Sequence, residues 1–255
     1  MSKLLIGCDP ECFWESDKGM MSVIGKLGGS KEMCFSISEN IHVLEDNVAA
    51  EFNPPPSDNL PDFMNKIHEN LEYLESAAKK YGATLSRLAS ASFQDSELEN
   101  PMAFVFGCEP DFNAWTGEQN PPPINEDYSL RSCGGHVHIG HGRSSVNIIR
   151  AMDLFLGVPS VILDKDEKRR SLYGKAGAYR PKPYGDEYRT LSNFWIFNDS
   201  LIEWVFNRTK MAVDWAKNNV IESDSTLAKA IQDAINSNNK DTVKSVFEMV
   251  PMAGV

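Results

Sequence analysis

The chain has 255 residues, of which 42% are hydrophobic and 24% are charged, as is ordinary for a globular protein with a large core. Acidic residues outnumber basic ones by 36 to 25, and the net charge of −11 argues against non-specific binding to DNA or RNA. No apolar run approaches about 18 residues, which argues against a membrane span, and the five irregularly spaced cysteines indicate reduced thiols in a cytoplasmic protein.

The first predicted strands each end in carboxylates. Residues 3–8 are apolar and predict a buried strand that runs into Asp9 and Glu11, which share a face if the strand continues. Residues 47–53 predict another strand, which carries Glu51 and is ended by three prolines. Neighbouring carboxylates repel each other unless a cation lies between them. The pairs therefore indicate a cation site, with a polar strand end as the simpler alternative.

The next segments predict scaffold and a loop. A helix that starts after Ser57 or Asp58 and runs to Tyr81 is indicated by apolar residues at spacings of three and four. Residues 83–92 predict a strand. Residues 118–127 contain three consecutive prolines and predict a loop suited to a lid or a substrate rim.

Two histidines follow a pair of glycines in a predicted strand. His136 and His138 are two residues apart, so they point to the same side of a strand. The glycines before them allow the backbone to come close to a ligand. This pattern is typical of metal sites but does not choose the metal, and Cys133 nearby makes zinc a competitor of magnesium.

The most basic part of the chain surrounds a short strand. Glu187 and Arg189 share a face of this strand, and a carboxylate beside a guanidinium suits a site that holds a metal and a phosphate together. A solvated basic loop is the alternative interpretation. Eight basic residues gather in this region: Lys165, Lys168, Arg169, Arg170, Lys175, Arg180, Lys182 and Arg189.

The remaining elements are predicted helices. One runs from Ser144 or Ser145 to Leu163 with a bend near Pro159, and a long amphipathic helix covers residues 193–217. Two more, at 225–236 and 239–249, close the chain. No linker divides the sequence, so we predict a single catalytic domain over residues 1–255, with 218–255 as a C-terminal helical extension.

Taken together, the predicted strands deliver polar side chains in same-face pairs: Asp9, Glu11, Glu51, Asn53, His136, His138, Glu187 and Arg189. Four carboxylates and an imidazole that converge would repel without divalent cations. Oxygen-rich ligation with little sulfur favours Mg²⁺ or Mn²⁺ over zinc. The added arginines and lysines fit a nucleoside triphosphate bound through those metals.

These motifs resemble the ordered metal- and ATP-binding motifs of the glutamine synthetase superfamily. They are Gly7-x-Asp9-Pro10-Glu11-x-Phe13, Glu51, Gly135-His136-x-His138 and Glu187-x-Arg189. The segment Tyr173–Thr190 is similar to a signature of the phage-type carboxylate–amine ligases (COOH–NH2 ligase type 2). The resemblance implies an α+β fold in which a curved, mostly antiparallel sheet forms the half barrel of the glutamine synthetase catalytic domain, backed by helices.

The resemblance also implies roles for individual residues. Asp9, His136 and Glu187 would bind the metal at the ATP phosphates, Glu11 and Glu51 the metal on the substrate side, and Arg189 the γ-phosphate. Asp46 is the candidate for one further acid before Glu51. Phosphate or ATP contacts would also come from His138, Lys175, Arg180 and Lys182. The long N-terminal domain of glutamine synthetase has no counterpart here, so its ring assembly is not implied and the oligomeric state stays open.

The leading hypothesis is an ATP-dependent carboxylate–amine ligase with two Mg²⁺ or Mn²⁺ ions. ATP would phosphorylate a small-molecule or peptide carboxylate, and an amine would attack the acyl phosphate. One alternative is a zinc-dependent hydrolase that uses His136, His138 and Cys133 or a nearby acid. The other is a non-catalytic protein that binds a nucleotide or metabolite.

Overall fold

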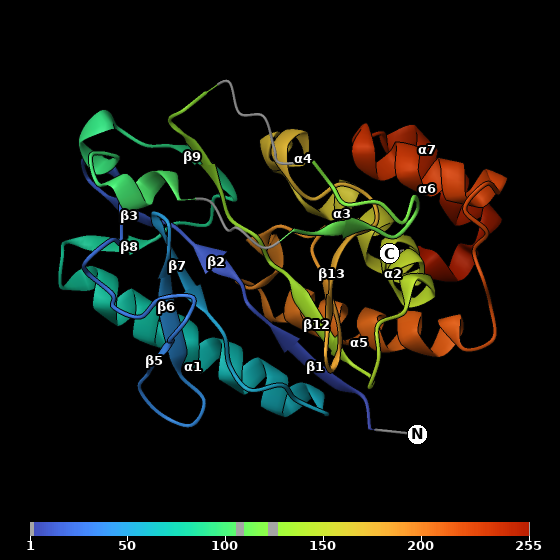
Figure 1. The fold of residues 1–255 in the computed structure, drawn as a ribbon, viewed down its shortest axis with the longest axis horizontal. Coiled ribbons are helices and arrows are strands. Elements are labelled where there is room, and N and C mark those ends of the chain that lie inside the picture. The colour runs from blue at the N-terminus through green and yellow to red at the C-terminus, as the bar shows by residue number, and fades with distance from the viewer. Residues whose placement is uncertain (1–2, 106–109, 122–126, 255) are drawn as a thin grey trace.

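The central sheet joins strands from distant parts of the chain (Figure 1). A computed structural model describes residues 3–105, 110–121 and 127–254, so part of the expected loop at 118–127 lies outside the described residues. Five strands pair antiparallel in this order: β1 (Leu5–Cys8), β12 (Val137–Gly140), β14 (Gly185–Tyr188), β13 (Ala178–Lys182) and β10 (Phe112–Asn113).

The register of the strands shows which residues share each face of the central sheet. One row across the sheet aligns Gly7, His138, Glu187 and Arg180 on four neighbouring strands. Because side chains alternate along a strand, this face is polar, whereas the opposite face carries residues such as Ile139 that pack in the main core. The central sheet therefore has a polar face, which carries the candidate site residues, and an apolar face, which packs against the helices.

After Pro10 the chain leaves the central sheet and enters a second one. This antiparallel sheet has the order β2 (Glu11–Cys12), β7 (Ala49–Phe52), β6 (His42–Asp46) and β5 (Phe35–Ser36). Strands β6 and β7 form a hairpin that turns at Asn47, whose φ of 58° is tolerated best by asparagine among non-glycine residues. The expected strand at 47–53 is thus shorter, and β6 was not predicted.

Two small antiparallel sheets lie beside these. One has the order β4 (Gly19–Met21), β3 (Trp14–Ser16) and β8 (Ala83–Leu85), and the other pairs β11 (Leu130–Ser132) with β9 (Ser90–Ser92). The single strand expected at 83–92 is therefore two strands in different sheets. Mixed α and β structure with antiparallel sheets is confirmed, and the sheets of the described residues do not close into a barrel.

Helix α1 (Leu60–Lys79) covers the second sheet (Figure 1). Its N-cap is Asn59, whose side chain accepts the N–H of Asp62 at 3.1 Å, rather than Ser57 or Asp58 as expected. The predicted helix at 193–217 is interrupted. A short 3₁₀ turn at Asn193–Trp195 precedes α5 (Asp199–Ala216), because Asn198 caps the new helix through the N–H of Leu201.

The C-terminal helices agree with the prediction. Helices α6 (Thr226–Asn236) and α7 (Lys240–Met249) pack on each other and on α3 (Val158–Leu163). A short helix that was not predicted, α4 (Lys168–Leu172), precedes β13.

The helix before α4 contains a wider turn. Helix α2 (Val146–Met152) continues through a π-turn at Asp153–Gly157 into α3. The expected bend near Pro159 is replaced by this π-turn. The turn lies just before Pro159 and accommodates this proline, which cannot donate an N–H. The stretch Val146–Leu163 is long and apolar enough to cross a membrane, contrary to expectation, but 67% of it is buried within the fold, as in a core helix.

Candidate active site

The polar face of the central sheet gathers a group of metal-binding side chains. Ligand atoms of Asp9, His138 and Glu187 lie within 4.8 Å of one another. The imidazole nitrogen Nε2 of His138 is 3.1 Å from Asp9 Oδ2, and Nδ1 of His136 is 3.2 Å from Asp9 Oδ1. Two carboxylates and an imidazole form a donor set that fits a divalent cation.

Three cationic side chains surround the buried carboxylate of Glu187, which is 1% exposed. Arg180 Nη1 lies 3.2 Å from both carboxylate oxygens, and Lys182 Nζ lies 3.2 Å from Oε2. Arg189 Nη1 contacts Oε1. Burial and Asp9 oppose the ionisation of Glu187, yet Arg189 and the two imidazoles hold its pKa below the ordinary value. Arg180, Lys182 and Arg189 thus place positive charge next to the metal-binding group, where an anion can also be held.

The surroundings shift the pKa values of the two histidines in opposite directions. Burial and then Arg189 lower the pKa of His136. Burial lowers and Asp9 raises the pKa of His138, with a net rise. Burial opposes the ionisation of Asp9, but His138 and His136 hold its pKa well below the ordinary range. Asp9 is thus an anion in contact with both rings.

A second acidic group lies where β2, β7 and β6 meet. Carboxylate oxygens of Glu11, Asp46 and Glu51 lie within 4.8 Å of one another, and Glu11 is directly opposite Glu51 across the strand pair. Lys31 Nζ is 2.8 Å from Asp46, and its side chain is 45% exposed.

Burial and mutual repulsion raise the pKa values of two carboxyls in the second group. Burial and then Asp46 raise the pKa of Glu11 to about 7. Burial and then Asp9 raise the pKa of Glu51 well above its ordinary value. The effect of Asp9 on Glu51 shows that the two acidic groups adjoin at Asp9. Burial and mutual repulsion outweigh the effect of Lys31 on both carboxyls, and a divalent cation would favour their ionised forms.

Gly134 links the two groups. Its N–H donates to Glu11 Oε2 at 2.7 Å, and a Cβ at this position would lie 2.3 Å from His136 Nε2. Any side chain here would displace the imidazole, so the glycine is required by the close approach of its backbone to His136.

The structure assembles most, but not all, of the residues expected at the site. Asn53 is exposed, and within the described ranges neither Asn53 nor Lys175 forms a side-chain hydrogen bond or ion pair with either acidic group. His138, which was expected to contact ATP or phosphate, joins Asp9 and Glu187 in the three-residue metal-binding group. His136 Nδ1 lies beside the same two carboxylates, 3.2 Å from Asp9 and 3.7 Å from Glu187. Cys133 is buried in a small apolar cluster that includes Phe13 and Phe93, away from a zinc-binding arrangement.

Other residues at the site were not predicted. The hydroxyl of Tyr184 is 2.5 Å from His138 Nδ1, and its ring stacks on the imidazole at 5.9 Å. Asp111 Oδ2 is 3.5 Å from Arg189 Nε. Lys31 pairs with Asp46 as described. Tyr184 lies within the Gly- and Pro-rich signature segment, which was the signal available for it, whereas Asp111 and Lys31 reach the site only through the fold.

A hollow of about 440 Å³ adjoins the cationic side chains at the outer edge of the central sheet. It is lined by Pro110, Phe112, Arg180, Pro181, Lys182 and Pro183. Arg180 and Lys182 therefore face Glu187 and also form part of this hollow, whose remaining wall is apolar.

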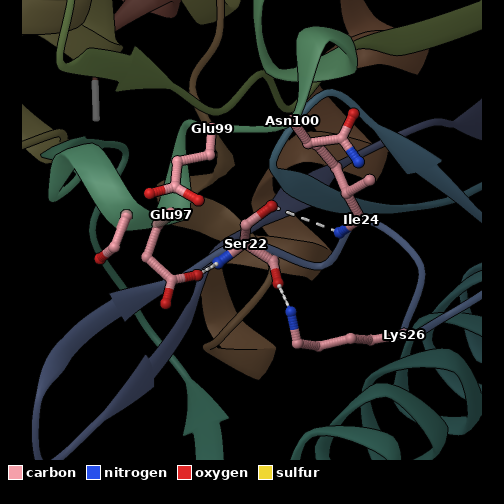
Figure 2. Close-up of a pocket in the computed structure, with 7 residues that line it drawn as sticks. Ser22, Ile24, Lys26, Glu97, Glu99 and Asn100 are labelled. Atoms are coloured by element: carbon pink, nitrogen blue, oxygen red, sulfur yellow. Dashed lines mark hydrogen bonds between the residues drawn. The ribbon is translucent and has the colours of Figure 1, made fainter.

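A second hollow, of about 390 Å³, has no residue in common with either acidic group (Figure 2). It is lined by Ser22, Ile24, Lys26, Ser96, Glu97, Glu99 and Asn100. Glu97 accepts the N–H of Ser22 at 2.8 Å and Lys26 donates to the carbonyl of Ser22 at 2.7 Å, so its charges hold the local loop (Figure 2).

Comparison with known families agrees with the resemblance seen in the sequence. The profile of the family described as phage phiEco32-like COOH.NH2 ligase-type 2 matches residues 125–253, just over half of the chain. The match includes His138, Glu187 and Arg189, whereas Asp9 and the second acidic group lie before it. No curated protein matches the sequence. The chain belongs to the family of phage phiEco32-like COOH.NH2 ligases of type 2.

Proposed function

We propose that this protein is an ATP-dependent carboxylate–amine ligase that forms an amide through an acyl phosphate. The observation that carries the proposal is the arrangement around Glu187, where three cations share one buried carboxylate beside two adjoining acidic groups. Family membership supports a ligase. The cations support an anionic cosubstrate such as ATP.

The two acidic groups fit two divalent ions. Asp9, His138 and Glu187 would hold one Mg²⁺ or Mn²⁺, and Glu11, Asp46 and Glu51 would hold the second. Bound there, the ions would neutralise charge on the phosphates and on the transferred phosphoryl group. His136 remains at the first ion as a neutral imidazole beside Asp9.

The cations of the chain would act on the nucleotide. Arg180, Lys182 and Arg189 would exchange part of their interaction with Glu187 for phosphate oxygens. The guanidinium of Arg189 is suited to the γ-phosphoryl group, because its planar fork can hold two oxygens at once. The hollow at Phe112 adjoins these cations and has room for the base and ribose.

The chemistry would take two steps. A carboxylate oxygen of the acid substrate attacks the γ-phosphorus, the bond to the β-phosphate oxygen breaks, and ADP leaves with the electron pair. The amine then attacks the acyl carbon, inorganic phosphate leaves, and the nitrogen loses a proton. Arg189 would stabilise charge on the transferred group in the first step.

The fold is compatible with this assignment. We infer that β1, β12, β14, β13 and β10, with the neighbouring β2 sheet, correspond to the half barrel of glutamine synthetase. The order of the site motifs along the chain supports this correspondence. The four described cysteines Cys8, Cys12, Cys34 and Cys133 are free thiols, which supports a cytoplasmic location.

A zinc hydrolase is the second candidate, because His138 with two carboxylates is also a ligand set that zinc accepts. Cys133 does not contribute to it. The cations around Glu187 and the second acidic group have no role in a single-zinc hydrolase, and they favour the ligase. A binding protein without catalysis would use the same contacts but show no turnover.

The experiment that separates these functions is a screen for ADP release. Purified protein with ATP and Mg²⁺ or Mn²⁺ is supplied with amino acids, polyamines, small peptides and nucleotides, singly and in pairs. A ligase releases ADP only when an acid and an amine are both present, and mass spectrometry shows the condensed product. Stoichiometric zinc in the purified protein, with ATP-independent hydrolysis, would contradict the proposal. ATP retention without any ADP would identify a binding protein.

A further inference from the structure

A buried aspartate outside the signature segment accepts hydrogen bonds from several of its residues. Asp153 begins the π-turn of the helix behind the central sheet and is 0% exposed. Four donors lie within hydrogen-bonding distance of its carboxylate: Trp115 Nε1 at 2.7 Å, the Gly177 N–H at 2.5 Å, the Tyr188 hydroxyl at 2.8 Å and Thr190 Oγ1 at 3.3 Å. The single proton of the Thr190 hydroxyl is shared with the Lys175 carbonyl, which is 3.1 Å away.

Three of these donors lie next to residues of the site. Tyr188 is between Glu187 and Arg189, Thr190 follows Arg189, and Gly177 directly precedes β13, which carries Arg180. Because side chains alternate along a strand, Tyr188 points away from the face that carries Glu187. Asp153 thus contacts β14 from behind and touches no residue of the site itself.

The helix is shaped for this contact. A Cβ on Gly157 would lie 2.6 Å from the Tyr188 hydroxyl and 3.2 Å from Asp153 Oδ1. Only a glycine leaves room for the tyrosine to reach the carboxylate. The π-turn brings Asp153 and Gly157 to this place, and such turns are frequent at functional sites.

We propose that Asp153 is a positioning residue, which fixes β14 and the turn before β13 so that Glu187, Arg189 and Arg180 converge on one metal ion. The inference rests on the proposed function, because it assumes a metal at Asp9, His138 and Glu187.

The test severs Asp153 from β14 while leaving the aspartate in place. The double variant Tyr188→Phe with Thr190→Val removes two hydroxyls and keeps both shapes. Asp153→Ala removes the whole anchor, and Asp153→Asn keeps an acceptor for the two N–H donors as the conservative variant. The matched control is Val243→Ala, at a fully buried position of α7 remote from the strands.

The readout is Mn²⁺ binding by calorimetry, without ATP and well below the melting temperature, corrected for the folded fraction. Glu187→Gln defines the binding that belongs to the site. We expect the double variant and Asp153→Ala to bind Mn²⁺ about 10-fold more weakly, as for loss of groups that orient metal ligands, and Asp153→Asn to be intermediate. Val243→Ala lowers the melting temperature and leaves Mn²⁺ affinity unchanged.

Amide hydrogen exchange without metal gives a second readout. Exchange should rise at residues 185–190 in the double variant and not in Val243→Ala. Unchanged Mn²⁺ affinity and unchanged exchange in the folded double variant would overturn the role of Asp153, and this holds even if Asp153→Ala does not fold. If Glu187→Gln leaves wild-type Mn²⁺ binding intact, the proposed metal site fails, while raised exchange at 185–190 would still show that Asp153 orders β14.

Discussion

Glu11 and Glu51 lie directly opposite each other on the antiparallel strands β2 and β7, with the carboxylate of Asp46 within 4.8 Å. Like charges in such a pair destabilise a sheet. Their raised pKa values follow from burial first and from neighbouring acids second. The fold therefore keeps a repulsion that Lys31 only partly offsets and that a bound cation would relieve.

Neutralising one member of this pair should stabilise the metal-free protein. We expect Glu51→Gln to raise the free energy of unfolding in EDTA by about 1 kcal/mol and to remove most of the stabilisation that Mn²⁺ gives the wild type. Thermal melts with and without Mn²⁺ measure both. Glu15→Gln, at an exposed position of β3, is the control and should change neither. A metal-free Glu51→Gln protein that melts below the wild type would remove the cation site from this place.

Arg189→Lys should separate binding from chemistry. The ammonium keeps the charge beside Glu187 but loses the planar fork. We expect nucleotide affinity to change little and single-turnover phosphoryl transfer to fall about 100-fold, as for loss of one oriented donor. Asp111→Asn removes the other ion-pair partner of Arg189 and should have a much smaller effect. A lower melting temperature with an unchanged rate per folded molecule would make Arg189 a structural residue.

Phe112→Ala tests the place of the nucleotide base. Phe112 lines the hollow beside Arg180 and Lys182. If the base stacks there, the variant should bind ATP about 10-fold more weakly and tripolyphosphate with unchanged affinity. Phe35→Ala, on another two-residue strand, should leave both affinities unchanged. Equal ATP affinity in Phe112→Ala and wild type would place the base elsewhere.

Asp153 should give the wild type a pH dependence that Asp153→Asn lacks. Burial, opposed by hydrogen bonds from Tyr188 first, raises the pKa of Asp153 to about 7. A carboxyl whose pKa is higher in the folded state favours folding when protonated, so this contribution is lost as pH rises from about 4 through about 7. Urea unfolding of both proteins between pH 5 and 8, with the difference plotted against pH, measures it. A difference that grows in favour of the wild type with pH would show that the four donors outweigh burial.

The alternation of residues along strands predicted the polar face of the central sheet well. His136 and His138 both contact Asp9, and Arg189 contacts Glu187, as their spacing predicts, although His136 precedes β12 and Arg189 follows β14. Spacing alone indicated Asp9 and Glu11 as one pair, whereas the family resemblance assigned them to different metals. They lie in different acidic groups, because β1 ends at Cys8 and the chain crosses to another sheet after Pro10. Spacing within one strand cannot show such a change of partner.

The contacts that complete the site depend on register between distant strands. His138 meets Glu187 because β12 pairs with β14, and the sequence places them 49 residues apart without a local signal. Asp46 was proposed from family resemblance, and the hairpin at Asn47 brings it to Glu51. Asp153 could not be found from sequence, since its role appears only when four separate donors converge on it.

Formation of an acyl phosphate can be tested directly by following oxygen from the acid substrate to the released phosphate. Pools of amino acids and peptides labelled with ¹⁸O in their carboxylates are incubated with the protein, ATP, Mg²⁺ and a mixture of amines. Mass spectrometry then measures the released phosphate. An acyl-phosphate ligase gives one ¹⁸O in each phosphate and ADP in equal amount, and we expect neither product with Glu187→Gln. Phosphate released without the label, in equal amount with ADP, would show that ATP is hydrolysed by water and would contradict an acyl-phosphate ligase.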